Sequence, residues 1–358
     1  MKTSVSEIFG RIDWWMVSVC VVLVGFGLLL IYSLTWPEDN RLVKQLIFFG
    51  VGIVLFLVFQ FFDIRFWRNT LFVFYLLTLV LLIGLLIFGE SIRGTRGWIP
   101  LGPIGFQVAE LAKITTILFI ASLLERLHFD LVKLRHVILL LLTIGLPVGL
   151  ILMQPDFGSA FIILIAGLVM IFYTGLDRKK LLLLLLAGII IAVIGWFGIL
   201  QDYQKQRVLT FLNPQSDPLG AGYNVQQAIV AIGSGGWYGR GIGLGTQSQL
   251  DFLPEQETDF IFASLAEELG FVGSLTLMLI YLFFLWRIYR SMKEGESLFS
   301  NFLILGLFVI FLTQAVINIG MNMGLFPVTG ITLPFVSYGG SSLIISFAAL
   351  GIIQNVRS

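Results

Sequence analysis

Ten apolar stretches, each about 20 residues long, constrain the fold of this chain more than any other feature of its sequence. They are centred near residues 22, 55, 78, 118, 146, 168, 192, 278, 311 and 347. Such a stretch crosses a bilayer as an α-helix, because a helix satisfies its own backbone hydrogen bonds in lipid. Only 12% of the residues are charged, which excludes a soluble globular domain. The sequence therefore predicts an all-α polytopic membrane protein in which residues 1–358 form a single domain.

The distribution of lysine and arginine predicts how these spans are oriented. An even number of spans puts both termini on one side of the membrane, and the segments on that side hold most of the Lys and Arg residues. Because short cytoplasmic loops carry an excess of these residues, both termini are predicted to be cytoplasmic. Residues 201–258, between the seventh and eighth spans, then form one large extracytoplasmic loop. Its recurring aromatic and apolar residues predict an ordered loop, and long ordered loops usually carry function.

The end of this loop places three carboxylates next to a membrane span. The sequence Pro254-Glu-Gln-Glu-Thr-Asp259 precedes the eighth apolar stretch, so Glu255, Glu257 and Asp259 lie near the start of a helix. The helix macrodipole stabilises negative charge at that position. One interpretation is a structural helix terminus with Thr258 as its cap. The other is a carboxylate that exchanges a proton with a substrate.

Two opposite charges lie within the predicted fourth span, which is expected to begin at Phe106. Glu110 and Lys113 are three residues apart on one helical face, so they are expected to pair. A single charge near the centre of a membrane helix costs roughly 2.5–3.5 kcal/mol. The pair therefore either fixes helix packing or lines a hydrated cavity in which Lys113 faces an anionic substrate.

Other side chains in the expected outer segments can bind an anion. Arginine binds phosphate bidentately, and hydroxyl and freed backbone N–H groups donate to oxyanions; the candidates are Arg41, Arg93, Arg96, Arg207, Ser337 and Ser341. Ordinary loop charge near lipid headgroups explains Arg41 equally well, and close helix packing by small residues explains Ser337 and Ser341. Asp156, in Gln154-Pro-Asp-Phe-Gly-Ser159, either caps the sixth span or has a functional role.

The chain contains no P-loop, no Cys/His spacing typical of a metal site and no nucleic-acid-binding motif. Several of its segments, taken in order, resemble the SEDS proteins (shape, elongation, division and sporulation), the bacterial peptidoglycan glycosyltransferases related to RodA and FtsW. The matching segments are residues 96–99, 106–113, 154–159, 206–214, 217–220, 233–236, 258–262, 267–270 and 334–341. Residues 245–249, followed by 252–255, resemble the RodA branch.

The resemblance implies a ten-span enzyme of the bacterial cytoplasmic membrane that polymerises lipid II into β-1,4 glycan strands during cell elongation and cell-shape maintenance. The family's catalytic aspartate corresponds to Asp259, which as general base would activate the acceptor hydroxyl, with undecaprenyl diphosphate as leaving group. Its intramembrane Glu and Lys correspond to Glu110 and Lys113. The candidate cations would stabilise the diphosphate, and Mg²⁺ or Mn²⁺ is expected to assist. Expected partners are a class B penicillin-binding protein, which is a transpeptidase, and other membrane proteins of the elongation complex, but no nucleic acid.

One residue departs from the family pattern. RodA-like sequences usually carry His before Thr-Asp-Phe, whereas this chain has Glu257. A second carboxylate close to Asp259 favours the protonated form of one of the two, or it helps to hold a divalent cation together with Glu255. Two other functions remain open: a lipid II flippase or other transporter, which would use the same Glu110 and Lys113, and a non-enzymatic scaffold for a transpeptidase, which would not require Asp259.

Overall fold

The computed structural model describes residues 12–35, 39–62, 64–90, 94–101, 104–127, 133–175, 220–250, 252–295 and 297–357, together with residue 10 and isolated residues between 177 and 211. Nine helices in these ranges coincide with predicted spans: α2 (Trp14–Thr35), α3 (Arg41–Gln60), α4 (Ile64–Phe88), α5 (Val108–Arg126), α6 (Leu134–Met153), α7 (Phe157–Tyr173), α12 (Ile261–Glu294), α13 (Leu298–Asn322) and α14 (Gly340–Arg357). The predicted seventh span, near residue 192, lies outside the described residues.

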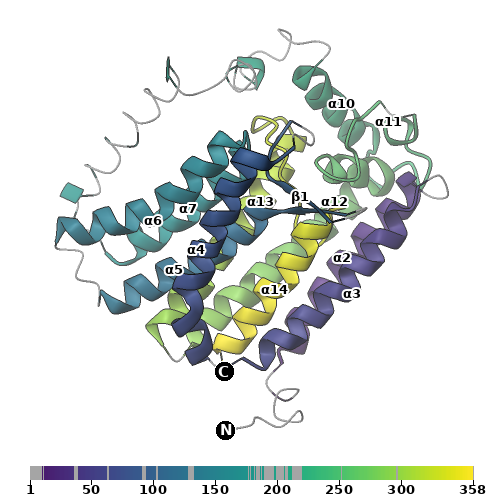
Figure 1. Cartoon of the computed structure of the whole chain (residues 1–358). Helices are drawn as coiled ribbons and strands as arrows, with labels where there is room; N and C mark the ends of the chain where they lie inside the picture. The colour runs from purple at the N-terminus through teal and green to yellow at the C-terminus, as the bar shows by residue number, and fades with distance from the viewer. Residues whose placement is uncertain are drawn as a thin grey trace.

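The helices pack side by side into one bundle around a largely apolar core (Figure 1). Among the described residues, α2, α3, α4, α6, α12 and α13 are long and apolar enough to cross a membrane. The apolar window of α13 is 72% buried inside the protein, whereas the windows of α3 and α4 are only 22% buried. Helices α5 and α14 carry more polar residues and are also buried for most of their length. The prediction of a helical polytopic membrane protein is confirmed.

A short β-hairpin is the one departure from an all-α chain within the described ranges. Strands β1 (Trp98–Leu101) and β2 (Ile104–Gln107) pair antiparallel, with Trp98 opposite Gln107. The prediction that the fourth span begins at Phe106 is therefore wrong by two residues, because Phe106 and Gln107 belong to β2 and α5 begins at Val108. Four-residue strands are too short for their alternation to be distinguished from a loop.

The described part of the large loop is folded onto the bundle, at the end that also carries the hairpin; we call this the loop end (Figure 1). It contains α10 (Ala221–Ser234) and the single turn α11 (Thr246–Gln249). On α10, Ala228 and Ala231 pack against Phe260 and Ala263. The small side chains allow α10 to lie close to the first turn of α12, so the loop supports the segment that contains Asp259.

Helix α12 is interrupted where the glycine-rich part of the loop meets it. Gly270 has a φ of 69°, in the left-handed region that favours glycine. The amides of Arg240 and Gly241 donate to the carbonyls of Glu267 and Glu268, at 2.9 and 3.0 Å. The loop backbone therefore takes hydrogen bonds that an unbroken helix would make internally, and the first turns of α12 are fastened to the loop.

The opposite end of the bundle is held by an ion cluster around the buried carboxylate of Asp13. The Asp13 carboxylate, which precedes α2, pairs with Arg287 of α12 and with Arg357 of α14, the latter at 2.9 Å. Glu294 also binds Arg357, at 2.6 Å. The first and last described helices thus meet at the same end of the molecule, as an even number of spans requires.

Close contact between α2 and the segment before α14 gives a stability prediction with an internal control. A Cβ atom on Gly27 would overlap the Val336 carbonyl oxygen, whereas a Cβ atom on Gly25 would have nothing within 4 Å. We expect Gly27→Ala to destabilise the protein by about 1–3 kcal/mol, the usual cost of overpacking. Thermal unfolding of detergent-solubilised protein would measure this, with Gly25→Ala expected to unfold near the wild-type temperature.

Candidate functional site

Four segments that are distant in sequence meet at the loop end. Gly158, in the first turn of α7, lies against Thr329 and Ile331, and a Cβ atom there would approach the Thr329 carbonyl oxygen to 2.9 Å. A Cβ atom on Gly330 would lie 3.6 Å from Oδ2 of Asp259. The Asp259 carboxylate therefore faces the segment between α13 and α14, which in turn packs on the start of α7.

The hairpin joins the same group of segments through Ser341 and Gln107. The Ser341 hydroxyl accepts a hydrogen bond from the Gln107 amide at 2.9 Å and donates to the Gly105 carbonyl at 3.2 Å. The Gln107 side chain donates to Asp156 at 2.8 Å. Asp156 also accepts from the amide and hydroxyl of Ser159, at 3.0 and 2.8 Å. The predicted helix cap at Asp156 is confirmed, and the same carboxylate ties the hairpin to α7.

The backbone of Asp259 is held by two asparagines of α13. The side-chain amides of Asn318 and Asn322 both donate to the Asp259 carbonyl, at 3.0 and 2.9 Å. The Asn322 side chain also accepts from the Ala263 amide at 2.9 Å. Both asparagines are fully buried, so their hydrogen bonds fix the start of α12 against the centre of the bundle.

The two residues before Asp259 are held from the other side. The Thr258 carbonyl accepts from the Ser337 hydroxyl at 2.6 Å, and the Glu257 carbonyl accepts from the Tyr338 amide at 2.8 Å. Three successive carbonyls are thus bound by other elements. Since each bound peptide loses backbone freedom, the backbone at Asp259 is held in place before any substrate binds.

The Asp259 carboxylate is partly exposed and lies directly before Phe260, the N-cap residue of α12. The positive end of the helix macrodipole favours negative charge at this position. The Thr258 hydroxyl donates to Glu255, to its Oε2 at 3.0 Å and its carbonyl at 3.2 Å. Thr258 therefore does not cap α12, and that interpretation of its hydroxyl is wrong.

The other two predicted carboxylates have different surroundings. Glu257 is 5% exposed and pairs with Arg41, which also binds Asp39 at 2.7 Å. Glu255 is exposed, and its φ of 51° is unusual for a residue other than glycine. Within the described ranges, no three His, Cys, Asp or Glu side chains lie close enough to hold a metal ion.

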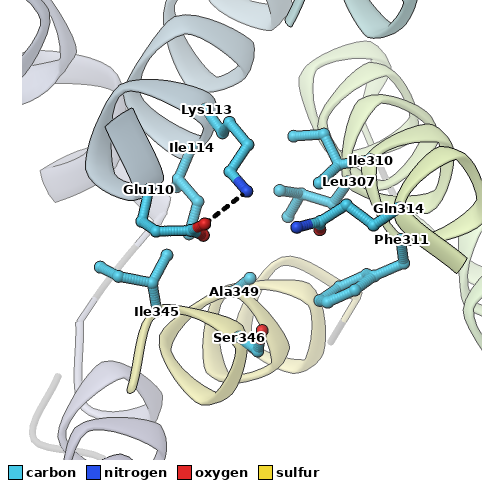
Figure 2. A pocket seen from close by; sticks show the side chains of 10 residues that line it. All are labelled: Glu110, Lys113, Ile114, Leu307, Ile310, Phe311, Gln314, Ile345, Ser346 and Ala349. Atoms are coloured by element: carbon cyan, nitrogen blue, oxygen red, sulfur yellow. Dashed lines mark hydrogen bonds and ion pairs between the residues drawn. The ribbon is translucent and has the colours of Figure 1, made fainter. Parts of the chain in front are cut away.

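Glu110 and Lys113 form the predicted pair, with 2.8 Å between the Lys113 Nζ and Glu110 Oε1 atoms. They line a small cavity between α5, α13 and α14, into which Gln314 and Ser346 also point (Figure 2). Lys113 is 2% exposed and Glu110 6%. The cavity volume of about 10 Å³ is room for one water molecule. A role of Lys113 in binding substrate stays a prediction, because this cavity does not admit a larger group as it stands.

The remaining predicted anion ligands differ in what the structure shows of them. Arg93 and Arg207 lie outside the described residues. Arg96 is exposed, with its amide donating to the Gln154 carbonyl at 3.3 Å. The hydroxyls of Ser337 and Ser341 are both engaged by backbone groups, so their structural role is established and their contact with substrate stays a prediction.

The importance of Asn318 and Asn322 is a finding of the structure. Their sequence signal is two amides four residues apart within an apolar span, the spacing of neighbours on one helical face. What the spacing does not reveal is the partner, which is a carbonyl 59 and 63 residues away in sequence.

Removing one of these amides gives a second stability prediction. Asn322→Ala would leave the buried Ala263 amide without its acceptor, and we expect a loss of about 1–3 kcal/mol of stability. Asn301→Ala, at the other end of α13, is the matched control. Equal unfolding temperatures for the two variants would contradict this role for Asn322.

The fold and the site together define an integral membrane protein. At one end of its helical bundle, the segment that carries Glu257 and Asp259 is held in place by contacts with other elements. The FtsW/RodA/SpoVE family of cell cycle proteins matches residues 14–358. The chain belongs to this family, which confirms the resemblance to the SEDS proteins.

Individual relatives match over nearly the whole chain. The peptidoglycan glycosyltransferase MrdB of Escherichia coli (strain K12) is 36% identical, over 97% of this chain and 94% of its own. The stage V sporulation protein E of Bacillus subtilis (strain 168) is also 36% identical, over 96% of both chains.

Two solved structures share the fold. A chain from a peptidoglycan synthase complex that coordinates polymerization and crosslinking superposes with a TM-score of 0.84 and 33% identity, covering 96% of this chain and 97% of that one. The rod shape determining protein RodA of Thermus thermophilus superposes with a TM-score of 0.73 and 31% identity, covering 96% of each chain.

Proposed function

We propose that this protein is a peptidoglycan glycosyltransferase that polymerises lipid II into β-1,4 glycan strands and acts in cell elongation and cell-shape maintenance. The main observation behind this proposal is the placement of Asp259. Its carboxylate lies at the start of α12, and the backbone carbonyls of residues 257, 258 and 259 all accept hydrogen bonds from other elements. The relatives named as peptidoglycan glycosyltransferases support the same reaction. A flippase or a scaffold would have no need for so closely fixed a carboxylate.

Asp259 acts as the general base. Its carboxylate accepts the proton of the 4-hydroxyl group of the acceptor GlcNAc, and that oxygen attacks the anomeric carbon of the donor strand. The bond from the anomeric carbon to the diphosphate oxygen breaks, and undecaprenyl diphosphate leaves with the electron pair. Attack from the face opposite the leaving group inverts the α-linked donor to a β-1,4 product.

The departing diphosphate needs positive charge, since preorganised cations and donors stabilise a developing oxyanion most strongly. Arg96 is exposed at the loop end, and Arg93 and Arg207 are further candidates from their place in the sequence. Lys113 would contribute if the small cavity opens toward the site, with Glu110 holding its ammonium group. Mg²⁺ or Mn²⁺ held near Glu255 would supply further positive charge to the diphosphate oxygens.

The proposal includes the location of the protein and its orientation in the membrane. The loop end faces outward from the bacterial cytoplasmic membrane and both termini are cytoplasmic, which the excess of Lys and Arg in the segments at the other end supports. A class B penicillin-binding protein is the expected partner, together with other membrane proteins of the elongation complex. The similarity to a chain of a peptidoglycan synthase complex supports a transpeptidase partner.

Purified protein in liposomes that contain lipid II tests the proposal against a flippase. We expect glycan strands to form on the face that the loop end occupies, with a class B partner raising the yield and a chelator lowering it. Movement of lipid II across the bilayer without polymer would support a transporter instead. A chelator without effect would remove the divalent ion from the proposal and leave the rest intact.

A further inference from the structure

Arg41 lies in the first turn of α3 and is bound by two carboxylates. Its guanidinium pairs with the buried carboxylate of Glu257, 216 residues away in sequence, and with the more exposed Asp39 at 2.7 Å. A cation in the first turn of a helix is disfavoured by the macrodipole, so these two partners compensate an otherwise unfavourable position. The guanidinium is already neutralised, which makes it a poor site for a diphosphate.

Two further residues on the same face of α3 contact the neighbouring segment. Gln45, one turn after Arg41, donates to the Ser337 carbonyl at 3.1 Å and accepts from the Gly339 amide at 3.3 Å. Phe48 packs against Gly340, where a Cβ atom would lie 2.7 Å from its ring. Positions 41, 45 and 48 lie on one helical face. This face of α3 therefore holds both the Glu257 side chain and the segment before α14.

The two segments that α3 holds are also bound to each other. Ser337 and Tyr338 donate to the carbonyls of Thr258 and Glu257, as described above. The contacts thus form a closed ring from Arg41 to Glu257, to the segment before α14, and back to α3 through Gln45. Asp259 directly follows Glu257 and Thr258, the two residues of its own segment that take part in these contacts.

We propose that Arg41 and Glu257 are positioning residues for Asp259, and that neither one contacts the diphosphate or a metal ion. The proposal rests on the glycosyltransferase function given above. We call residues 255–260 the catalytic segment. The buried side chain of Glu257 belongs to this segment, and its ion pair with Arg41 connects the segment to α3. Because Glu257 is buried and paired, removing either partner leaves the other without this counter-charge, and we expect the segment to shift.

A double-mutant cycle with Arg41→Gln and Glu257→Gln distinguishes positioning from substrate binding. We expect each single variant to lower kcat by about 10- to 100-fold, as small misplacements of catalytic groups do, with KM for lipid II nearly unchanged. The double variant should be no slower than the slower single variant, because both changes break the same contact. Lys44→Gln, which removes another cation from the first turns of α3, is the matched control and should keep wild-type kinetics.

Hydrogen exchange of the backbone gives a readout that does not depend on activity. The amides of Thr258, Asp259 and Phe260 donate to the Glu255 carbonyl, and the Tyr338 amide donates to Glu257. We expect all four to exchange faster in each single variant than in wild type or Lys44→Gln. Hydrogen exchange therefore tests the positioning role independently of activity. If the wild-type protein formed no glycan, that result would count against the proposed function but not against the positioning role.

Two results would overturn the inference. An increased KM for lipid II with unchanged kcat in Arg41→Gln, together with multiplicative effects in the double variant, would make Arg41 a substrate ligand, as the sequence predicted. Unchanged exchange at the four amides in both single variants would show that the ion pair does not hold the catalytic segment.

Discussion

Replacing Asp259 with asparagine is expected to lower the rate of lipid II polymerisation by about 10²- to 10⁴-fold, the usual contribution of general-base catalysis. Asparagine has nearly the same shape but cannot accept the proton of the attacking hydroxyl. The hydrogen bonds from Asn318 and Asn322 go to the backbone carbonyl of residue 259, so the substitution leaves them intact. The variant should therefore lose activity without losing its fold.

The measurement is the initial rate of lipid II consumption together with the unfolding temperature. Glu90→Gln changes another exposed carboxylate, close to the end of α4, and should keep the wild-type rate. An Asp259→Asn variant that is slow only because it unfolds early would leave the general-base role unsupported. A folded variant with a normal rate would refute that role directly.

Breaking the Glu110–Lys113 pair is expected to have the largest effect on stability. Both side chains are almost completely buried, and removing one partner leaves an uncompensated charge. We expect Glu110→Gln to cost about 3–5 kcal/mol, the usual range for a broken buried pair. The double variant Glu110→Gln with Lys113→Met should recover most of this loss, because it buries no net charge.

The same double variant separates the two interpretations of the pair. If Lys113 acts only in packing, the stable double variant should polymerise lipid II at a rate near that of wild type. If Lys113 stabilises the leaving diphosphate, the double variant should be stable and slow. Unfolding temperature and initial rate, measured on the same preparation, decide between them.

The parts of the fold that local sequence determines could be predicted. Apolar length gave the spans, because a helix in lipid depends on little besides its own side chains. The Asp156 cap and the Glu110–Lys113 pair also follow from spacings of three residues. The hairpin before α5 was not predicted, since its two strands are only four residues long.

Contacts between distant segments could not be predicted. Nothing near Glu257 in the sequence indicates Arg41 as its partner, and the pair forms because α3 and the end of the loop meet in the folded bundle. The resemblance to a family located Asp259, but it did not show what holds that residue in place. The amides of Asn318 and Asn322 are visible in the sequence only as polar residues in an apolar span.

The synthesis of glycan strands by this chain is the most direct test of its function. Purified wild-type protein, with a class B partner and Mn²⁺, is incubated with labelled lipid II, and the products are resolved by length on a gel beside those of Asp259→Asn. We predict strands that increase with time for wild type and unreacted lipid II for the variant. Equal strand synthesis by both proteins, or none by wild type with or without the partner and the ion, would contradict a glycosyltransferase centred on Asp259.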